Sequence, residues 1–99
     1  MIRHVFMWQV AEGNDPDEVI DLLNTLKGMS SIRSWELGKH TGDPGDNGTP
    51  WDGVLINDFD DWNGLEEYSV DPFHGEVVAK LLPKLAARAV VDFEQDSSA

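Results

Sequence analysis

One tyrosine and one histidine stand on either side of an Asp-Pro pair in this chain. Tyr68 precedes Asp71-Pro72, and His74 follows shortly after the proline. Aspartate is a favoured N-cap and proline is favoured at the first helical position, so a helix is predicted to begin here with His74 in its first turn. The positive end of the helix dipole disfavours a protonated imidazole, which makes His74 a candidate general base. Tyr68 is then a candidate hydrogen-bond donor.

If these two side chains do chemistry, the reaction they suit is removal of a proton next to a carbonyl group. His74 would take the proton, and Tyr68 would stabilise the enolate or alkoxide by hydrogen bonding. The alternative is structural, because a tyrosine and a histidine at a helix junction also commonly bond to backbone or to each other. Spacing alone does not decide between these two roles.

The elements that must position these residues follow from hydrophobic periodicity. In residues 2–10 apolar side chains occur on both faces of an alternating pattern, which predicts a strand covered on both sides. Asp15-Pro16 and Glu18 have the pattern of an N-cap, a first helical proline and a capping-box glutamate. Pro83 is expected to kink or end the helix that begins at Asp71-Pro72. The expected elements are a strand at 2–10, a helix at 15–28, a strand around 32–37, a long exposed loop at 41–50, a strand at 51–59, a short helix at 61–68, a helix from 72 and a strand at 89–93.

The order strand, helix, strand, strand, helix, strand predicts an α+β fold, a ferredoxin-like βαββαβ sandwich. Its helices cover one face of the sheet, yet the chain has apolar residues for both faces. We assign to the face away from the helices the large apolar residues Ile2, Phe6, Trp8, Leu55 and Phe59. A second copy is expected to cover that face, so that two sheets form a dimeric α/β barrel enclosing a cavity. The residues predicted to line this cavity and bind a substrate are His4, Phe6, Trp8, Gly53, Leu55 and Asn57.

Composition limits the partners. The 99 residues carry 19 acidic and 7 basic side chains, a formal net charge of −12, which argues against binding to nucleic acid phosphates. With no cysteine there are no disulfides or thiolate ligands, and a reducing cytoplasm is the expected location. No apolar run is long enough for a membrane span, and neither a metal nor a cofactor is expected. Residues 1–95 are predicted to form a single domain and residues 96–99 a polar tail.

Three motifs of the chain match a known pattern. They are Met1-Ile2-Arg3-His4-Val5 at the start, Tyr68 followed by Asp71-Pro72-Phe73-His74, and Ala89-Val90-Val91-Asp92-Phe93 at the end. With these motifs the chain resembles the stress-responsive dimeric α/β-barrel (Dabb) family from residue 2 to about residue 94. The resemblance implies a homodimer of ferredoxin-like subunits. Most members of that family have no assigned activity, so the resemblance alone does not define a function.

One plant member of the family is a polyketide cyclase that performs an intramolecular aldol condensation. The resemblance implies that Tyr68 and His74 match its tyrosine and histidine, and that His4 matches a first-strand histidine. The chain departs from that cyclase at Gly53, which replaces a pocket histidine, and at Asp71, which replaces a histidine of its His-Pro-x-His motif. The leading hypothesis is a homodimer that binds an apolar or aromatic small molecule. The alternatives are a cofactor-free cyclase or lyase with His74 as base, and a purely structural stress protein whose stability or assembly is its function. For His4 itself, the alternative to a role in the pocket is a buried histidine bonded across the sheet.

Overall fold

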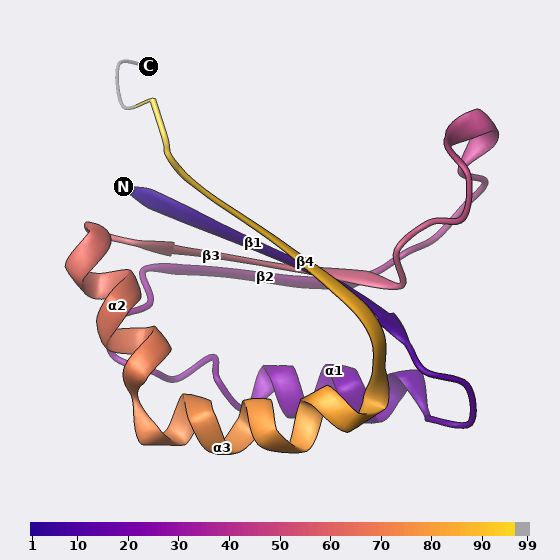
Figure 1. The fold of residues 1–99 in the computed structure, drawn as a ribbon. Helices are drawn as coiled ribbons and strands as arrows, with labels where there is room; N and C mark the ends of the chain where they lie inside the picture. Colours follow the sequence, from indigo (N-terminus) through magenta and orange to yellow (C-terminus); the bar gives the residue numbers. More distant parts are fainter. Residues whose placement is uncertain (97–99) are drawn as a thin grey trace.

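The computed structural model describes residues 1–96, so residues 97–99 of the predicted polar tail lie outside the described residues. A four-stranded antiparallel sheet has the strand order β2-β3-β1-β4, and the helices lie on one side of it (Figure 1). This is the ferredoxin-like α+β arrangement, which confirms the predicted fold class. Within residues 1–96 no helix is both long and apolar enough to cross a membrane. The elements are β1 (Ile2–Val10), α1 (Pro16–Asn24), β2 (Ser34–Lys39), β3 (Gly53–Phe59), α2 (Trp62–Val70), α3 (Pro72–Leu81) and β4 (Leu85–Glu94).

Asp15-Pro16 and Asp71-Pro72 begin helices α1 and α3, as predicted. Asp15 Oδ1 accepts a hydrogen bond from a backbone N–H in the first turn of α1 at 2.9 Å, and Asp71 Oδ1 accepts one from the Phe73 N–H at 2.8 Å. The capping-box role predicted for Glu18 is wrong. Its Oε2 instead accepts from Lys84 Nζ at 2.9 Å, and this pair joins α1 to the segment just before β4.

Helix α1 ends at Asn24, earlier than the predicted end near Gly28. After Asn24, the backbone N–H groups of Thr25, Leu26 and Lys27 bond to carbonyls three residues earlier, so the chain tightens into a turn. Leu26 still belongs to the core and is 2 % exposed. Apolar spacing therefore continues beyond the helix, which is why periodicity extended the prediction too far.

The end of α3 and the loop between β2 and β3 lie where they were predicted, but β4 begins at Leu85, earlier than the predicted strand at 89–93. Helix α3 ends at Leu81, and a 3₁₀ turn, Leu82–Lys84, follows it, which confirms the effect predicted for Pro83. Between β2 and β3 an exposed loop carries a short 3₁₀ turn, Gly45–Asn47, and extends beyond the end of the sheet (Figure 1). Strand β2 lies at an edge of the sheet, as its weaker apolar pattern suggested.

The large apolar residues assigned to the face away from the helices lie on the helix-covered face instead. Ile2 and Trp8 of β1 and Leu55 of β3 are each no more than 2 % exposed and form one buried cluster with residues of all three helices. Alternation shows which residues share a face of a strand, but it does not show which face the helices cover. The buried core consists of Ile2, Trp8, Val19, Leu23, Leu26, Leu55, Phe59, Leu65, Tyr68, Val77 and Leu81.

The opposite face of the sheet, called the open face below, is apolar as well. Cross-strand pairing places on it Val5, Met7, Val54, Ile56, Val91 and Phe93. Val91 and Phe93 are 54 % and 44 % exposed, because no helix lies over them. At one end of this face Arg3 Nε and Nη2 donate to the two carboxylate oxygens of Asp58 at 2.9 and 3.0 Å, and this pairing lowers the pKa of Asp58. Both faces of β1 are apolar, as predicted, but the residues on them are exchanged.

Candidate functional site

His74 lies in the first turn of α3, where the sequence predicted it. Its imidazole is half-buried, and burial is the main reason why the pKa of His74 is lowered. The nearby His4 imidazole adds to this lowering, whereas the Ser69 backbone and the Asp71 carboxylate oppose it. At neutral pH the His74 ring is therefore uncharged and able to accept a proton.

Tyr68 lies in the last turn of α2 and is 2 % exposed. Its ring is tilted against the His74 ring, with 4.5 Å between the ring centroids, and is 6.1 Å from the His4 ring. Burial raises the pKa of Tyr68 to about 12, so the phenol keeps its proton across the physiological range. The structure brings Tyr68, His74 and His4 together in one place. The site therefore has a proton acceptor, His74, next to a hydrogen-bond donor, Tyr68.

His4 is held by a residue that the sequence analysis did not select. His4 and Asp92 are direct cross-strand partners on β1 and β4, and the Asp92 carboxylate bonds to His4 Nδ1. The carboxylate accepts a hydrogen bond from Nδ1 and so fixes the orientation of the His4 ring. In the sequence, Asp92 is a polar residue between Val91 and Phe93 in the last predicted strand, so its side chain was expected on the face opposite to theirs. The pairing register that places it beside His4 was not available from the sequence.

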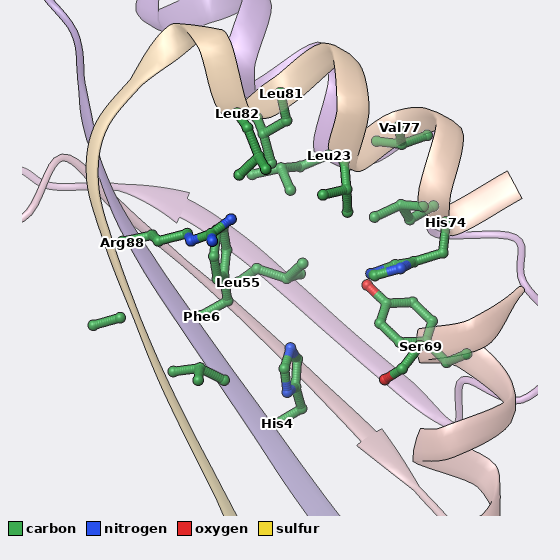
Figure 2. Close-up of a pocket in the computed structure, with 15 residues that line it drawn as sticks. His4, Phe6, Leu23, Leu55, Ser69, His74, Val77, Leu81, Leu82 and Arg88 are labelled. Carbon is green, nitrogen blue, oxygen red and sulfur yellow. The ribbon is translucent and has the colours of Figure 1, made fainter. Parts of the chain in front are cut away.

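A cavity of about 410 Å³ lies between the sheet and helices α1 and α3 (Figure 2). Five of the residues selected from the sequence line it: His4, Phe6, Leu55, Tyr68 and His74. Most of the remaining wall is aliphatic. The residues expected to line a cavity between the sheets of two subunits face the helices instead, and the pocket that some of them line is formed by a single chain. The further lining residues are Leu23, Leu26, Ser69, Val77, Val78, Leu81, Leu82, Arg88, Ala89 and Val90.

Three residues from the predicted binding set, Trp8, Gly53 and Asn57, are absent from the wall of this pocket. A Cβ atom on Gly53 would lie 2.3 Å from Trp8 Cζ2, so the indole ring occupies the space that the glycine leaves. Trp8 is 1 % exposed and stacks on Phe6, with 5.9 Å between the ring centroids. Asn57 is fully buried between β1 and β2. Neither polar atom of its amide has full hydrogen-bond geometry within the described residues, but the amide is near enough to Tyr68 to oppose the effect of burial on the pKa of the phenol.

The remaining candidates lie away from the pocket. His40 is exposed in the loop after β2, where its Nε2 contacts the Gly42 carbonyl oxygen at 2.9 Å. No group of three or more histidine, aspartate or glutamate side chains in residues 1–96 is arranged to hold a metal ion. The described site is thus an apolar cavity with three aromatic polar side chains, His4, Tyr68 and His74, gathered at one end.

Comparison with known proteins gives a family and a fold. The model of the family described as "Stress responsive A/B Barrel Domain", Dabb, matches residues 2–95 of the chain. Among curated proteins none matches significantly.

Solved structures of the same fold come from plants and bacteria. Protein At3g17210 from Arabidopsis thaliana is 20 % identical with a TM-score of 0.82, and the match covers 100 % of this chain and 99 % of that one. A dimeric ferredoxin-like protein of unknown function from Thermobifida fusca is 26 % identical with a TM-score of 0.77, covering 95 % of this chain and 90 % of that one. Hydroxynitrile lyase from Passiflora edulis is 14 % identical with a TM-score of 0.82, covering 99 % of this chain and 95 % of that one.

Proposed function

This chain belongs to the family of stress responsive A/B barrel domains, and we propose that it is a homodimer that binds an apolar or aromatic small molecule in the pocket between its sheet and helices. One observation carries the proposal. A cavity of about 410 Å³ has mostly apolar walls and a small group of polar side chains at one end. This combination is typical of small-molecule sites, because apolar walls provide affinity and a few polar groups orient the ligand.

The homodimer follows from the open face. Val91 and Phe93 are large and apolar, yet they are 54 % and 44 % exposed, as expected for a surface that a second copy covers. Two sheets packed through their open faces leave the helix-covered pocket of each subunit intact, so each copy has its own site. The similar Thermobifida fusca protein is described as dimeric, which supports this assembly.

Native mass spectrometry of the purified protein tests both parts. We expect a dimer that takes up an aromatic probe such as methyl 2-naphthoate, at one molecule per subunit. Val78 lines the pocket, so Val78→Phe is expected to weaken binding of this probe about tenfold by filling the cavity. Val70→Phe is the matched control, because Val70 is 71 % exposed outside the pocket. A monomer at all concentrations would contradict the assembly, and equal binding by both variants would contradict the site.

A second candidate function is favoured by the contact between His74 and Tyr68. An uncharged imidazole beside a protonated phenol in an apolar cavity suits aldol-type cyclisation or a related lyase reaction on a carbonyl substrate. His74 removes a proton from the carbon next to a carbonyl, and Tyr68 stabilises the enolate oxygen. The enolate carbon bonds to a second carbonyl carbon, and the proton on His74 passes to the new alkoxide. The lyase from Passiflora edulis supports the suitability of this fold for such chemistry.

Cyclisation of an aromatic 1,5-diketone is the assay for this second function. His74→Ala is expected to lower the rate about 100-fold, as for loss of a general base, and Tyr68→Phe by a similar factor. The rate is also expected to fall as the pH drops below the pKa of His74. His40→Ala is the control, since His40 is exposed in a loop outside the pocket. Unchanged turnover in His74→Ala would eliminate this mechanism.

We also keep the cytoplasm as the predicted location, on the ground that the chain has no cysteine. Cell fractionation with an antibody against the protein tests this prediction.

A further inference from the structure

Resting on the proposed pocket, we infer that its ligand carries an anionic group, and that Arg88 binds this group at the end of the pocket away from His74. Arg88 is on the helix-covered face of β4, where its cross-strand partner is Trp8. It is the only permanently charged side chain that lines the pocket within the described residues. Figure 2 shows its guanidinium extending from β4 over the cavity, between Phe6 and Leu82.

The guanidinium of Arg88 is unpaired, unlike most basic side chains of this protein. Within residues 1–96 it makes no hydrogen bond or ion pair, and no carboxylate lines the pocket. In a chain with 19 acidic and 7 basic residues, carboxylates are abundant elsewhere on the surface. The paired basic residues are Arg3 with Asp58, Arg33 with Asp60, Lys39 with Asp17, and Lys84 with Glu18.

The two polar ends of the pocket are separated along both walls. Arg88 and Asp92 are four residues apart on β4, which corresponds to about 13 Å at about 3.3 Å per residue. On the opposite wall, His74 is near the start of α3 and Leu82 follows its end. Figure 2 shows Leu23 and Leu55 between the two ends. A ligand that uses both ends is therefore elongated, with an apolar or aromatic middle.

The chemistry of Arg88 defines the class of ligand. A planar guanidinium binds a carboxylate through two parallel hydrogen bonds, and such charge-assisted bonds are stronger than neutral ones. With a net charge of −12 the protein repels anions at long range, so an acidic ligand needs a local cation of this kind. The ligand class is an aromatic or long aliphatic carboxylic acid whose other end presents a carbonyl or hydroxyl group to His74 and Tyr68.

Two probes that share the same aromatic ring, one charged and one neutral, test this inference. We propose isothermal titration calorimetry of the dimer with 2-naphthoate and with its neutral methyl ester, at low and at high ionic strength. The wild-type protein is expected to bind the carboxylate more tightly than the ester, and only the carboxylate affinity should fall with salt. Arg88→Leu is expected to weaken carboxylate binding about tenfold and to change ester binding less than about twofold.

Two further variants separate the local contact from general effects. Arg33→Leu removes the same charge from an exposed side chain outside the pocket, where Arg33 Nε pairs with Asp60 at 3.0 Å, so it should leave both affinities unchanged. Arg88→Lys keeps the charge but loses the planar fork, and should retain part of the preference for the carboxylate. The thermal unfolding midpoint of each variant checks that the fold is intact.

The outcomes separate this inference from the proposed function. Ester binding without preference for the carboxylate would overturn the role of Arg88 and leave the binding pocket standing. Equal losses for both probes in Arg88→Leu would also overturn it, because they would show that Arg88 acts only by packing. Binding of neither probe would overturn the proposed pocket and the inference together.

Discussion

The two faces of the sheet are both apolar, yet they differ in what covers them and in what chemistry they carry. On the helix-covered face Trp8 is 1 % exposed, and Tyr68, which packs against this face from α2, is 2 % exposed. The phenol of Tyr68 is therefore shielded from water. On the open face Val91 is 54 % exposed, and the charged residues Arg3 and Asp58 form an ion pair with each other. On the covered face, exclusion of water raises the pKa of Tyr68 and lowers that of His74, and both residues line a pocket that a ligand can enter. The open face carries exposed apolar side chains, as a protein interface does.

The largest expected effect comes from breaking the covered face at its core. Trp8→Ala removes a fully buried ring that fills the space over Gly53, and should lower the free energy of unfolding by about 3–5 kcal/mol. Urea denaturation at a fixed protein concentration measures this change. Val70→Ala is the control, since Val70 is 71 % exposed and its loss should cost no more than about 0.5 kcal/mol. A loss below about 1 kcal/mol for Trp8→Ala would show that the indole is not part of the core.

A charge introduced on the open face is expected to weaken the dimer. Val91→Asp places a carboxylate within the proposed interface and should raise the dimer dissociation constant about 100-fold, since burying an unpaired charge is costly. Sedimentation equilibrium measures the constant, and far-ultraviolet circular dichroism should show an unchanged fold. Val70→Asp makes the same chemical change at a site 71 % exposed and away from the sheet, and should leave the dimer intact. An unchanged dimer in Val91→Asp would place the interface elsewhere.

A smaller effect is expected in the ionisation of Tyr68, the single tyrosine of the chain, which reports on the covered face. Because burial raises the pKa of Tyr68 to about 12, its phenol should ionise later than the ordinary value of 10.0. The unfolded chain loses this proton first, so the free energy of unfolding should decrease as the pH rises above 10.0. Absorbance at the phenolate band follows the titration, with Tyr68→Phe as the blank and protein in urea as the reference. A midpoint near 10.0 in the folded protein would show that the phenol is solvated.

The smallest expected effect concerns His74, whose pKa is lowered from 6.5 mainly by burial. Above pH 6.5 the imidazole is neutral in both states; below it the unfolded chain binds a proton that the folded chain does not. The free energy of unfolding should therefore decrease as the pH falls from 6.5 toward the lower folded-state pKa. Nuclear magnetic resonance titration of the ring proton measures the folded pKa, and His74→Gln should remove this contribution. A folded midpoint at or above 6.5 would contradict the dehydrated site.

Local signals were sufficient for most elements and for the central pair of the site. Asp15-Pro16 and Asp71-Pro72 mark real helix starts, because capping and the fixed φ of proline act within one turn. The same local logic placed His74 in a first turn and Tyr68 in the last turn of the helix before it. It could not exclude Trp8 and Gly53 from the binding set, since their contact with each other depends on packing across the sheet.

The sequence by itself determined the order of elements, the helix starts and the sets of residues that share a strand face, because capping and side-chain alternation are local properties. Only the tertiary structure decided which of the two apolar faces lies under the helices, and this choice moved the cavity from between two subunits into a single chain. It also decided the register of β4 against β1, which brings Asp92 to His4 and Arg88 to the pocket. The strand register and the choice of covered face depend on contacts between residues distant in sequence. The local pattern makes both faces of the sheet apolar, and helix packing decides which of them is buried.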